Sequence, residues 1–457
     1  MYGLAAGIQS CGPDFPALRL LVRDARMVAD FVDSRFAIHD SRMTRFVYTL
    51  LLYLLLPYVL ARLAWRARRQ RGYLEHVAER FGYGAPQADG GPLIWVHAVS
   101  VGETRAAEPL VRELRARYPQ HRVLLTHMTP TGRETGETLF DDQVMRCYLP
   151  YDYPGAVARF LERYRPRIGL LMETEIWPNL IRGCRDRGVP LYLVNARLSE
   201  KSFGRYRRFP ALARESLAGF TAVVAQGEED ARRLAALGAS NVRVTGNIKF
   251  DIAPPPAQVE LGRALRVRLG EGRPVFLAAS TREGEEALLL DVLDRIGAQH
   301  LLTVIVPRHP QRFDEVAQLL KARGVSFQRR SADAAVGGDT RVVLGDSMGE
   351  MFAYYVASDV VFVGGSLLPL GGQNLIEACA VGKPVLIGPS TYNFAEAVEL
   401  AVRAGAAIQV PDAAAVAREA TRLLGDPAAR GRMAQAALAF AQAHRGATGK
   451  VVELLRF

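Results

Sequence analysis

The stretch that decides the fold is Val360-Val-Phe-Val-Gly-Gly-Ser-Leu-Leu-Pro-Leu-Gly-Gly-Gln-Asn-Leu-Ile-Glu-Ala378. It begins with a short continuous apolar run, typical of a strand buried in a parallel sheet, and passes through a glycine-rich loop into a helical pattern. Glycines let a backbone approach a ligand closely, and the N–H groups at a helix start favour an anion such as phosphate. Glu377 follows Asn374 at a position where its carboxylate can accept hydrogen bonds from ribose hydroxyls. The stretch therefore favours a nucleotide site over turns and helix caps alone.

Short apolar runs alternate with longer helical patterns on both sides of this stretch. The runs form two series, at residues 93–96, 122–125, 168–172, 190–194 and 222–225, and at residues 274–278, 301–306, 342–344, 359–363 and 384–387. Continuous apolar runs separated by helices predict βαβ units, and hence parallel sheets with helices on both faces. The predicted fold class is α/β, with one sheet for each series.

The most proline-rich stretch, Asp251-Ile-Ala-Pro-Pro-Pro-Ala257, separates the two series. It predicts a linker over residues 251–272, a first domain over 72–250 and a second domain over 273–457, whose last helix packs back on the first domain. A ligand cleft is expected between two such domains. The chemistry is expected in loops at the carboxyl ends of the strands.

Composition excludes several classes of protein. The chain has 457 residues, of which 49% are hydrophobic and 23% charged, as in an ordinary folded protein. Its four cysteines lie far apart, which argues against a disulfide scaffold or a zinc ribbon. There is no H-E-x-x-H, Walker P-loop or histidine–cysteine cluster, so neither a metal site nor ATP hydrolysis is expected, and no G-x-G-x-x-G suggests a dehydrogenase.

A basic and apolar segment lies near the N-terminus. Residues 43–71 contain the apolar run Phe46–Ala61, and the surrounding segment is rich in arginine without any acid. Extended to Trp65, the run has about 20 residues, enough to cross a hydrocarbon core of ~30 Å. We expect a membrane anchor here, with the large C-terminal body in the cytoplasm by the positive-inside tendency. Pro57 and Arg62 leave open a helix lying on the membrane or in a protein core.

Met43 directly precedes this apolar run, whereas residues 1–42 resemble neither a targeting signal nor a domain. We therefore expect Met43 to be the natural start and residues 1–42 to be an extension.

In the second domain, candidate ligand-binding residues follow two of the expected strands. Arg308 comes just after residues 301–306, where its guanidinium can pair bidentately with phosphate or form a surface salt bridge. His309 is either a contact to base or phosphate or an ordinary loop histidine. The turn Asp346–Glu350 leads into a helix, and its backbone groups can read a base edge, although Asp346 by itself is most simply an N-cap.

In the first domain, carboxylates and cations follow the expected strands. Glu103 opens a helix after residues 93–96 and is a candidate general base, although a glutamate in a first helical turn is also favoured by the macrodipole. Glu173 and Glu175 follow residues 168–172, and one of them can bind substrate while the other caps a helix. Residues 195–202 offer two cations, Arg197 and Lys201, for an acidic substrate.

Taken together, eight motifs in order resemble the 3-deoxy-D-manno-octulosonic acid (Kdo) transferase family of lipopolysaccharide assembly. The resemblance extends from about residue 43 to the end of the chain, including the anchor. The motifs are His97–Glu103, Met172–Asn179, Asn195–Ser202, Gly246–Asp251, Ser280–Glu286, Pro307–Pro310, Asp346–Glu350 and Gly371–Glu377.

The resemblance implies a GT-B glycosyltransferase, with two Rossmann-like domains facing across a cleft, anchored by an N-terminal helix to a bacterial inner membrane on its cytoplasmic face. It implies transfer of Kdo from CMP-Kdo to the lipid A precursor lipid IVA, with inversion of the anomeric carbon. Neither a catalytic metal nor another cofactor is implied, and no nucleic-acid partner.

The resemblance also implies roles for individual residues. Glu103 matches the family's proposed general base, and Glu173 and Glu175 match a further catalytic motif whose individual roles stay open. The positions assigned to CMP-Kdo binding are Arg308, His309, Met348, Gly349, Glu350, Asn374 and Glu377. The positions assigned to the acceptor or the sugar carboxylate are Ser100, Arg197, Lys201 and Lys249.

Two rival hypotheses stay open. A UDP-sugar 2-epimerase or UDP-dependent transferase would share the glycine-rich loop and the ribose-binding glutamate, but should lack the anchor and the Glu103 motif. A catalytically inactive protein that keeps the fold would be favoured by loss of Glu103 or Arg308, and both residues are present.

Overall fold

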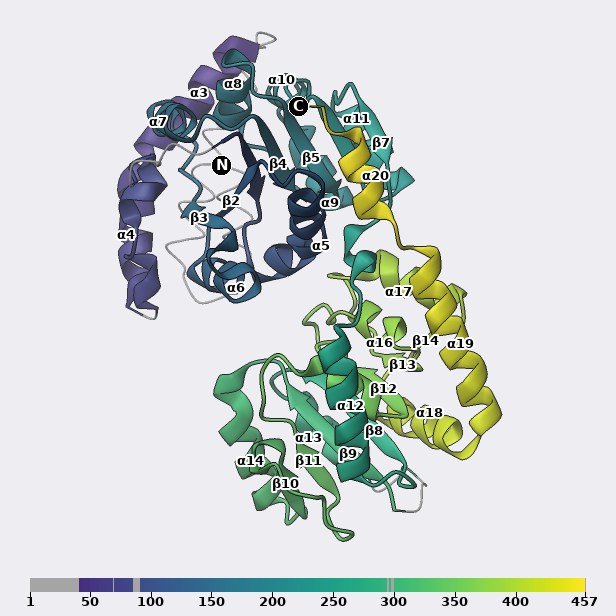
Figure 1. Cartoon of the computed structure of the whole chain (residues 1–457). Coiled ribbons are helices and arrows are strands. Elements are labelled where there is room, and N and C mark those ends of the chain that lie inside the picture. The colour runs from purple at the N-terminus through teal and green to yellow at the C-terminus, as the bar shows by residue number, and fades with distance from the viewer. Residues whose placement is uncertain (1–40, 69, 85–90, 294–295, 297–299, 457) are drawn as a thin grey trace. The chain divides into compact units, whose positions relative to one another are not determined.

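The computed structural model describes residues 41–456 apart from 69, 85–90, 294–295 and 297–299 (Figure 1). Contacts divide the chain into two compact units. The first unit ends at Ile248 and also takes in the chain from Gly446 onward, and the second unit is Lys249–Arg445. The extension expected at residues 1–42 lies outside the described residues, except that Ser41 and Arg42 begin the first described helix.

The described residues of the first unit form a seven-stranded parallel sheet in the order β3-β2-β1-β4-β5-β6-β7. Its strands are β1 (Leu93–His97), β2 (Arg122–His127), β3 (Met145–Tyr148), β4 (Ile168–Met172), β5 (Leu191–Ala196), β6 (Ala222–Ala225) and β7 (Val242–Val244). Every residue of β1, β4, β5 and β6 is buried, because apolar clusters pack on both faces of the sheet. The helices that follow the strands are α5 (Val101–Arg117), α6 (Pro130–Phe140), α7 (Pro154–Tyr164), α8 (Pro178–Asp186), α9 (Glu200–Tyr206), α10 (Pro210–Leu217) and α11 (Glu228–Ala236).

The described residues of the second unit form another seven-stranded parallel sheet, in the order β10-β11-β9-β8-β12-β13-β14. Its strands are β8 (Val275–Thr281), β9 (Leu302–Pro307), β10 (Phe327–Arg329), β11 (Val342–Leu344), β12 (Val360–Val363), β13 (Val385–Ile387) and β14 (Ala407–Gln409). Apolar clusters again cover both faces. The helices are α12 (Pro256–Leu269), α13 (Glu285–Leu290), α14 (Phe313–Ala322), α15 (Met351–Ala357), α16 (Ile376–Ala380), α17 (Ala395–Arg403), α18 (Ala413–Gly425) and α19 (Pro427–Ala443). The two α/β sheets expected from the sequence are therefore present.

The segment expected to be a linker is largely helical. Pro256 is the first residue of α12, in agreement with the preference of proline for that position. The helix packs against α15 so closely that a Cβ on Gly262 would lie 2.5 Å from the Cβ of Val356. Leu265 and Leu269 are buried in the core of the second unit. Most of residues 251–272 therefore belong to the second unit instead of forming an extended connection.

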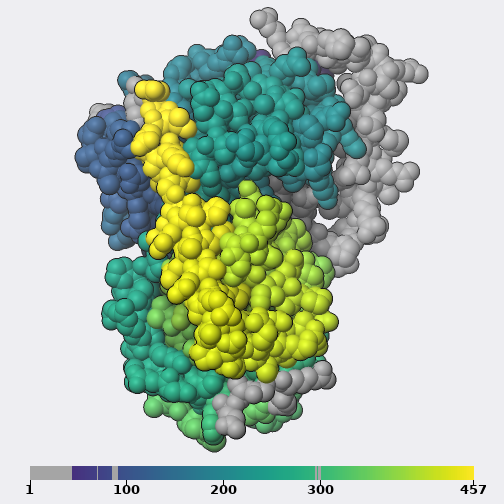
Figure 2. Space-filling view, turned by 90° about the vertical axis from the view of Figure 1, so that its right-hand side faces the viewer, coloured from purple at the N-terminus to yellow at the C-terminus, as the bar shows by residue number. Residues whose placement is uncertain are grey.

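The C-terminal helix α20 (Ala447–Leu454) belongs to the first unit and packs against α5. Val451 and Val452 are buried in the same apolar cluster as the leucines of α5. In Figure 2 this yellow segment lies against the blue surface of the first unit.

The expected N-terminal anchor is a broken helix. It consists of α3 (Ser41–Leu54) and α4 (Leu56–Ala67), and the helices over Thr44–Leu54 and Leu56–Ala67 meet at a bend of 48°. Pro57 lies in the first turn of α4, and proline both lacks an N–H group and crowds the preceding helical turn. Among the described residues, the bent pair together has the length and apolar composition to cross a membrane, whereas no single helix does.

Polar contacts fix one face of α3 to the first unit. Arg45 forms an ion pair of 2.7 Å with Glu215, and the Tyr48 hydroxyl donates to Asp152 Oδ2 at 2.9 Å. Burial raises the pKa of Asp152 to about 6, against the effect of the hydrogen bonds it accepts. Large apolar side chains are exposed on α3 at Phe46, Leu50, Tyr53 and Leu54, and on α4 at Leu60 and Trp65. Helix α3 therefore differs from a typical surface helix, because its polar contacts face the protein and large apolar side chains are exposed.

Candidate functional site

The candidate residues of the first unit follow the carboxyl ends of neighbouring parallel strands. β1 pairs with β4 and β4 pairs with β5, so the loops after these three strands emerge from one edge of the sheet. Glu103 and Ser100 follow β1, Glu173 and Glu175 follow β4, and Arg197 and Lys201 follow β5.

Glu103 lies in the first turn of α5. Its Oε2 accepts the Val99 N–H at 2.9 Å, and Ser100 Oγ lies 3.4 Å from Oε1. Ser100 is the N-cap residue of this helix. The carboxylate thus closes the helix start, as the macrodipole favours, and it is held in one position by the backbone. Both roles considered for Glu103, helix capping and proton acceptance, are compatible with this geometry.

Glu173 and Glu175 share the loop after β4. Glu173 has a left-handed backbone with φ 58°, and its N–H donates to Val194 O on the neighbouring strand at 3.0 Å. Glu175 Oε2 accepts the Trp177 indole N–H at 2.7 Å. Burial raises the pKa of Glu175 to about 7, the Trp177 hydrogen bond opposes this, and the Glu173 carboxylate adds to it. Glu175 is therefore poised to gain or lose a proton near neutral pH.

His97, the last residue of β1, lies next to Glu175. Its Nδ1 lies 3.0 Å from the carbonyl oxygen of Thr126, which only accepts, so this hydrogen bond assigns the proton to Nδ1. Its Nε2 lies 3.9 Å from Glu175 Oε2. Burial lowers the pKa of His97 to about 3, so the ring is neutral at neutral pH. The sequence analysis included His97 in a motif but gave it no role.

The cations assigned to an acidic substrate do not all lie in the same unit. The Arg197 carbonyl accepts the Thr174 hydroxyl at 2.7 Å, which joins the loops after β4 and β5, and Lys201 is exposed on α9. Lys249 belongs to the second unit, where its Nζ lies 5.7 Å from the centre of the Phe394 ring.

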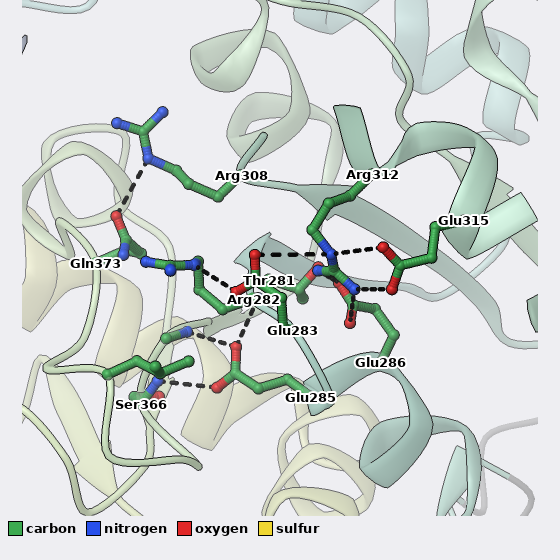
Figure 3. Close-up of polar contacts among 12 residues, drawn as sticks. Thr281, Arg282, Glu283, Glu285, Glu286, Arg308, Arg312, Glu315, Ser366 and Gln373 are labelled. Atoms are coloured by element: carbon green, nitrogen blue, oxygen red, sulfur yellow. Dashed lines mark hydrogen bonds and ion pairs between the residues drawn. The ribbon is translucent and has the colours of Figure 1, made fainter. Parts of the chain in front are cut away.

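In the second unit, Arg308 lies beside the glycine-rich loop. Its N–H donates to Thr281 O at 2.9 Å, and its Nε donates to Gln373 Oε1 at 3.3 Å (Figure 3). The pKa of the neighbouring His309 is lowered by burial and by the positive charges of Arg282 and Arg308. A neutral histidine and a guanidinium thus stand together at the carboxyl end of β9.

Asn374 and Glu377 are linked at the start of α16. Asn374 Oδ1 accepts the Ile376 N–H at 3.0 Å, and its Nδ2 donates to Glu377 Oε1 at 3.2 Å. Arg308 donates to Gln373, which precedes Asn374 in the chain, and Asn374 donates to Glu377. These hydrogen bonds connect the expected phosphate-binding and ribose-binding groups.

The turn between β11 and α15 carries the other candidates. Met348 is 52% exposed, and Gly349 has φ 79°, a conformation that favours glycine. Glu350 accepts the Ser347 hydroxyl at 2.6 Å and pairs with Arg330 at 3.3 Å. The contacts of Glu350 with Ser347 and Arg330 thus hold the turn, and the apolar side chain of Met348 is exposed on it.

Glu285 lies in the motif Ser280–Glu286, where no role was predicted for it, and its carboxylate occupies part of the glycine-rich loop. It accepts the backbone N–H groups of Gly365, Ser366 and Leu367. A phosphate expected near the glycines must therefore use other donors, such as the start of α16. A carboxylate in the first turn of a helix that directly follows a strand was the available signal. Among the described residues, no group of three or more His, Cys, Asp and Glu side chains is placed to hold a metal ion.

The chain is similar to known glycosyltransferases along most of its length. Residues 75–252 match the family model described as 3-deoxy-D-manno-octulosonic-acid transferase, and residues 323–440 match that of glycosyl transferases group 1. The 3-deoxy-D-manno-octulosonic acid transferase of Bordetella pertussis is 48% identical over 428 residues, which cover 90% of this chain and 99% of that protein. The chain belongs to the Kdo transferase family. It is a glycosyltransferase.

A second relative supports the family, and solved structures support the fold. The Kdo transferase of Haemophilus influenzae is 37% identical over 91% of this chain and 98% of its own length. The UDP-GlcNAc 2-epimerase of Neisseria meningitidis has a TM-score of 0.55 at 18% identity, covering 79% of this chain and 98% of that one. A glycosyltransferase of Rickettsia africae has a TM-score of 0.56 at 15% identity, covering 80% and 98%. These two structures show that the fold of this Kdo transferase family member is shared by a UDP-GlcNAc 2-epimerase and by another glycosyltransferase.

Proposed function

We propose that this enzyme transfers Kdo from CMP-Kdo to lipid IVA with inversion of the anomeric carbon, as a step of lipopolysaccharide assembly. The observation that carries the proposal is the hydrogen-bonded connection of Arg308, through Gln373, to Asn374 and Glu377 in a member of this family. The names of the relatives supply the sugar, and the sugar nucleotide follows from a site with a guanidinium for phosphate and a carboxylate for ribose.

The donor leaves as CMP, a phosphate monoester, so negative charge develops on its phosphate during the reaction. The Arg308 guanidinium stabilises that charge, together with the N–H groups at the start of α16. We propose that these groups supply the positive charge that a metal ion supplies in other transferases. Full activity in excess EDTA is the expected result, and loss of activity that Mg²⁺ restores would contradict it.

The acceptor is a sugar hydroxyl, which must lose its proton as it attacks the anomeric carbon. We propose that Glu103 takes this proton. Its carboxylate is fixed by the Val99 N–H and lies at the start of α5, so it does not have to be ordered when substrate binds. A direct displacement assisted by one base inverts the anomeric carbon.

We further propose that the enzyme sits on the cytoplasmic face of the inner membrane through α3 and α4. The outer side of α3 exposes Phe46, Leu50 and Leu54 at 64%, 48% and 68%, and arginines extend along α4. The contacts of the inner face of α3 with Glu215 and Asp152 support a helix pair that lies in the lipid headgroup region, with its apolar side toward the lipid.

The membrane proposal is tested by flotation of the full chain with vesicles. We expect binding to anionic vesicles, weaker binding to zwitterionic ones, and loss of binding in Phe46→Ser/Leu54→Ser. The control is Val267→Ser, an exposed apolar residue on α12. Alkaline carbonate should release the enzyme from native membranes. Retention after carbonate would indicate a spanning anchor instead.

The reaction is tested by incubating the purified full chain with CMP-Kdo and lipid IVA, followed by mass spectrometry and NMR of the lipid. The expected product carries added Kdo with the anomeric configuration opposite to that of the donor. A titration with CMP and with UDP separates the proposal from a UDP-sugar enzyme, because tighter binding of UDP would contradict it.

A further inference from the structure

Glu285 is a fully buried carboxylate at the start of α13, next to the glycine-rich loop (Figure 3). It accepts the N–H of Arg282 in its own loop at 2.9 Å. It also accepts three consecutive N–H groups of the loop after β12, from Gly365 at 2.5 Å and from Ser366 and Leu367 at 2.9 Å.

Consecutive backbone N–H groups that point to one place form a concave site for an anion, and such sites often bind phosphate. Here a side chain of the same molecule fills the site. The two loops also touch directly, since a Cβ on Gly364 would lie 2.7 Å from the Ser280 carbonyl oxygen. The loop after β12 therefore has its shape before any ligand arrives.

Hydrogen bonds connect the loop that Glu285 contacts to the residues around the nucleotide site. The Gly372 N–H donates to Gly365 O at 2.6 Å, and the Gln373 N–H donates to Gly364 O at 3.0 Å. Gln373 in turn accepts the Nε of Arg308 at 3.3 Å, and Asn374 follows it in the chain. A short path of hydrogen bonds thus joins Glu285 to Arg308.

Glu286, the next residue, holds a different loop. Its carboxylate accepts both terminal nitrogens of Arg312, at 2.7 and 3.0 Å, and the Thr281 hydroxyl at 2.7 Å. Arg312 lies in the segment after β9 that also contains Arg308. The Glu286 side chain is 1% exposed and that of Arg312 is 7% exposed, so this ion pair is buried and fully hydrogen-bonded.

We propose that Glu285 and Glu286 are positioning residues for the sugar nucleotide. Glu285 acts as a built-in anion that sets the loop after β12, and Glu286 sets the segment after β9, so that Gln373, Asn374 and Arg308 are in place before the donor binds. This inference rests on the proposed function, because it concerns the nucleotide of that reaction.

The first test is Glu285→Gln and Glu286→Gln in the full chain, with CMP binding measured by calorimetry. Glutamine removes the charge and turns an N–H₂ group toward donors, so CMP affinity should fall about 10- to 100-fold for each variant. The acceptor KM should stay within about twofold of wild type, because the proposed base Glu103 and the acceptor candidates Ser100, Arg197 and Lys201 lie in the other unit. An unchanged CMP affinity in either folded variant overturns the role of that residue, and an equal rise of donor and acceptor KM indicates a general loss of structure and overturns both.

Matched controls lie beside both residues. Glu283→Gln and Glu315→Gln change two further carboxylates near Arg312, at 4.0 and 3.1 Å, whose side chains are 55% and 64% exposed. Both should bind CMP as wild type does. A loss in these controls as large as in Glu285→Gln and Glu286→Gln would overturn the inference.

The second test is chemical rescue. Glu285→Ala leaves four N–H groups facing a space that formate can fill, so added formate should restore CMP affinity in this variant and not in Arg308→Ala. Absence of rescue in a folded Glu285→Ala overturns the built-in anion. If that variant does not fold, the glutamine variant decides. If the wild type binds UDP in place of CMP, the proposed function fails, and the same variants titrated with UDP still test the positioning role.

Discussion

Both units contain a seven-stranded parallel sheet, although the strand orders differ, and the carboxylates at the two sheets have different partners. In the second unit, Glu285 accepts four backbone N–H groups and Glu286 accepts a guanidinium and a hydroxyl, and both are buried. In the first unit, Glu175 accepts the Trp177 indole, faces the neutral ring of His97, and has its pKa raised to about 7.

The partners of each carboxylate indicate whether it is structural or can exchange a proton. A carboxylate surrounded by donors is stabilised in its charged form and organises backbone, as Glu285 does. A buried carboxylate with few donors is ready to exchange a proton, and such groups cluster at functional sites. The same residue type at equivalent sheet edges therefore has two uses, decided by its partners.

The largest expected effect comes from Glu103→Gln. The amide keeps an acceptor for the Val99 N–H but removes the base, so turnover should fall about 10²–10⁴-fold while CMP affinity and thermal stability stay nearly unchanged. Steady-state kinetics and calorimetry measure this. A near wild-type rate would make Glu103 a structural carboxylate like Glu285, and Glu173 or Glu175 would be tested next.

The nucleotide site should respond to Arg308→Ala and Glu377→Ala. Each removes a charged hydrogen-bonding group, so CMP binding should weaken by about 1.5–3 kcal/mol. Calorimetry is the measurement, and Arg403→Ala on α17 is the matched control, since its side chain is 67% exposed. Unchanged CMP affinity in both variants would show that the second sheet edge does not hold the nucleotide.

Glu175→Gln should change how stability depends on pH. The pKa of Glu175 is about 7 in the folded protein and near 4.5 when unfolded, so its contribution to stability is full below pH 4.5 and is lost as pH rises through 7. The wild type should therefore lose stability relative to the glutamine variant between about pH 5 and pH 8. Urea unfolding across this range measures the difference. If the unfolding free energies of the two proteins change in parallel with pH, Glu175 is stabilised in its charged form, as Glu285 is.

The smallest expected effect comes from Tyr48→Phe. Asp152 accepts the N–H groups of Asn179 and Leu180 as well as the Tyr48 hydroxyl, so it has more donors than Glu175, although burial still raises its pKa to about 6. Loss of one hydroxyl donor should cost about 1 kcal/mol of unfolding free energy and leave turnover in detergent unchanged. Denaturant unfolding measures the cost, and a large loss of turnover would give α3 a part in catalysis.

The central strands could be predicted from the sequence, and the edge strands could not. The expected runs correspond to the inner strands of both sheets, where burial on two faces makes almost every residue apolar. The four strands that the sequence analysis did not predict, β3, β7, β10 and β14, are the outer strands of the two sheets. They are short and partly exposed, as in the sequence Val-Arg-Val of β7, and carry no continuous apolar run.

The functional residues show a similar limit. The positions of Glu103, Arg308 and Glu377 at strand ends follow from local sequence, because a strand, its loop and the next helix are contiguous in the chain. Three of the four N–H groups that Glu285 accepts are 80 to 82 residues away, and nothing in the segment around Glu285 predicts them. The prolines near the start of α12 likewise predicted a linker. Proline also suits the first turn of a helix, and here Pro256 begins a helix that packs into a core.

The sequence by itself thus determined that the chain is α/β, where its inner strands lie and which polar side chains follow them, because burial and glycine leave a local pattern. Tertiary contacts, in contrast, determine which glutamate accepts a guanidinium, which accepts four backbone N–H groups and which lies beside a neutral histidine. They also determine that the apolar N-terminal segment bends at Pro57 and gives one face to Glu215 and Asp152. The state of a buried charge depends on groups brought to it from distant parts of the chain, and the fold alone brings them together.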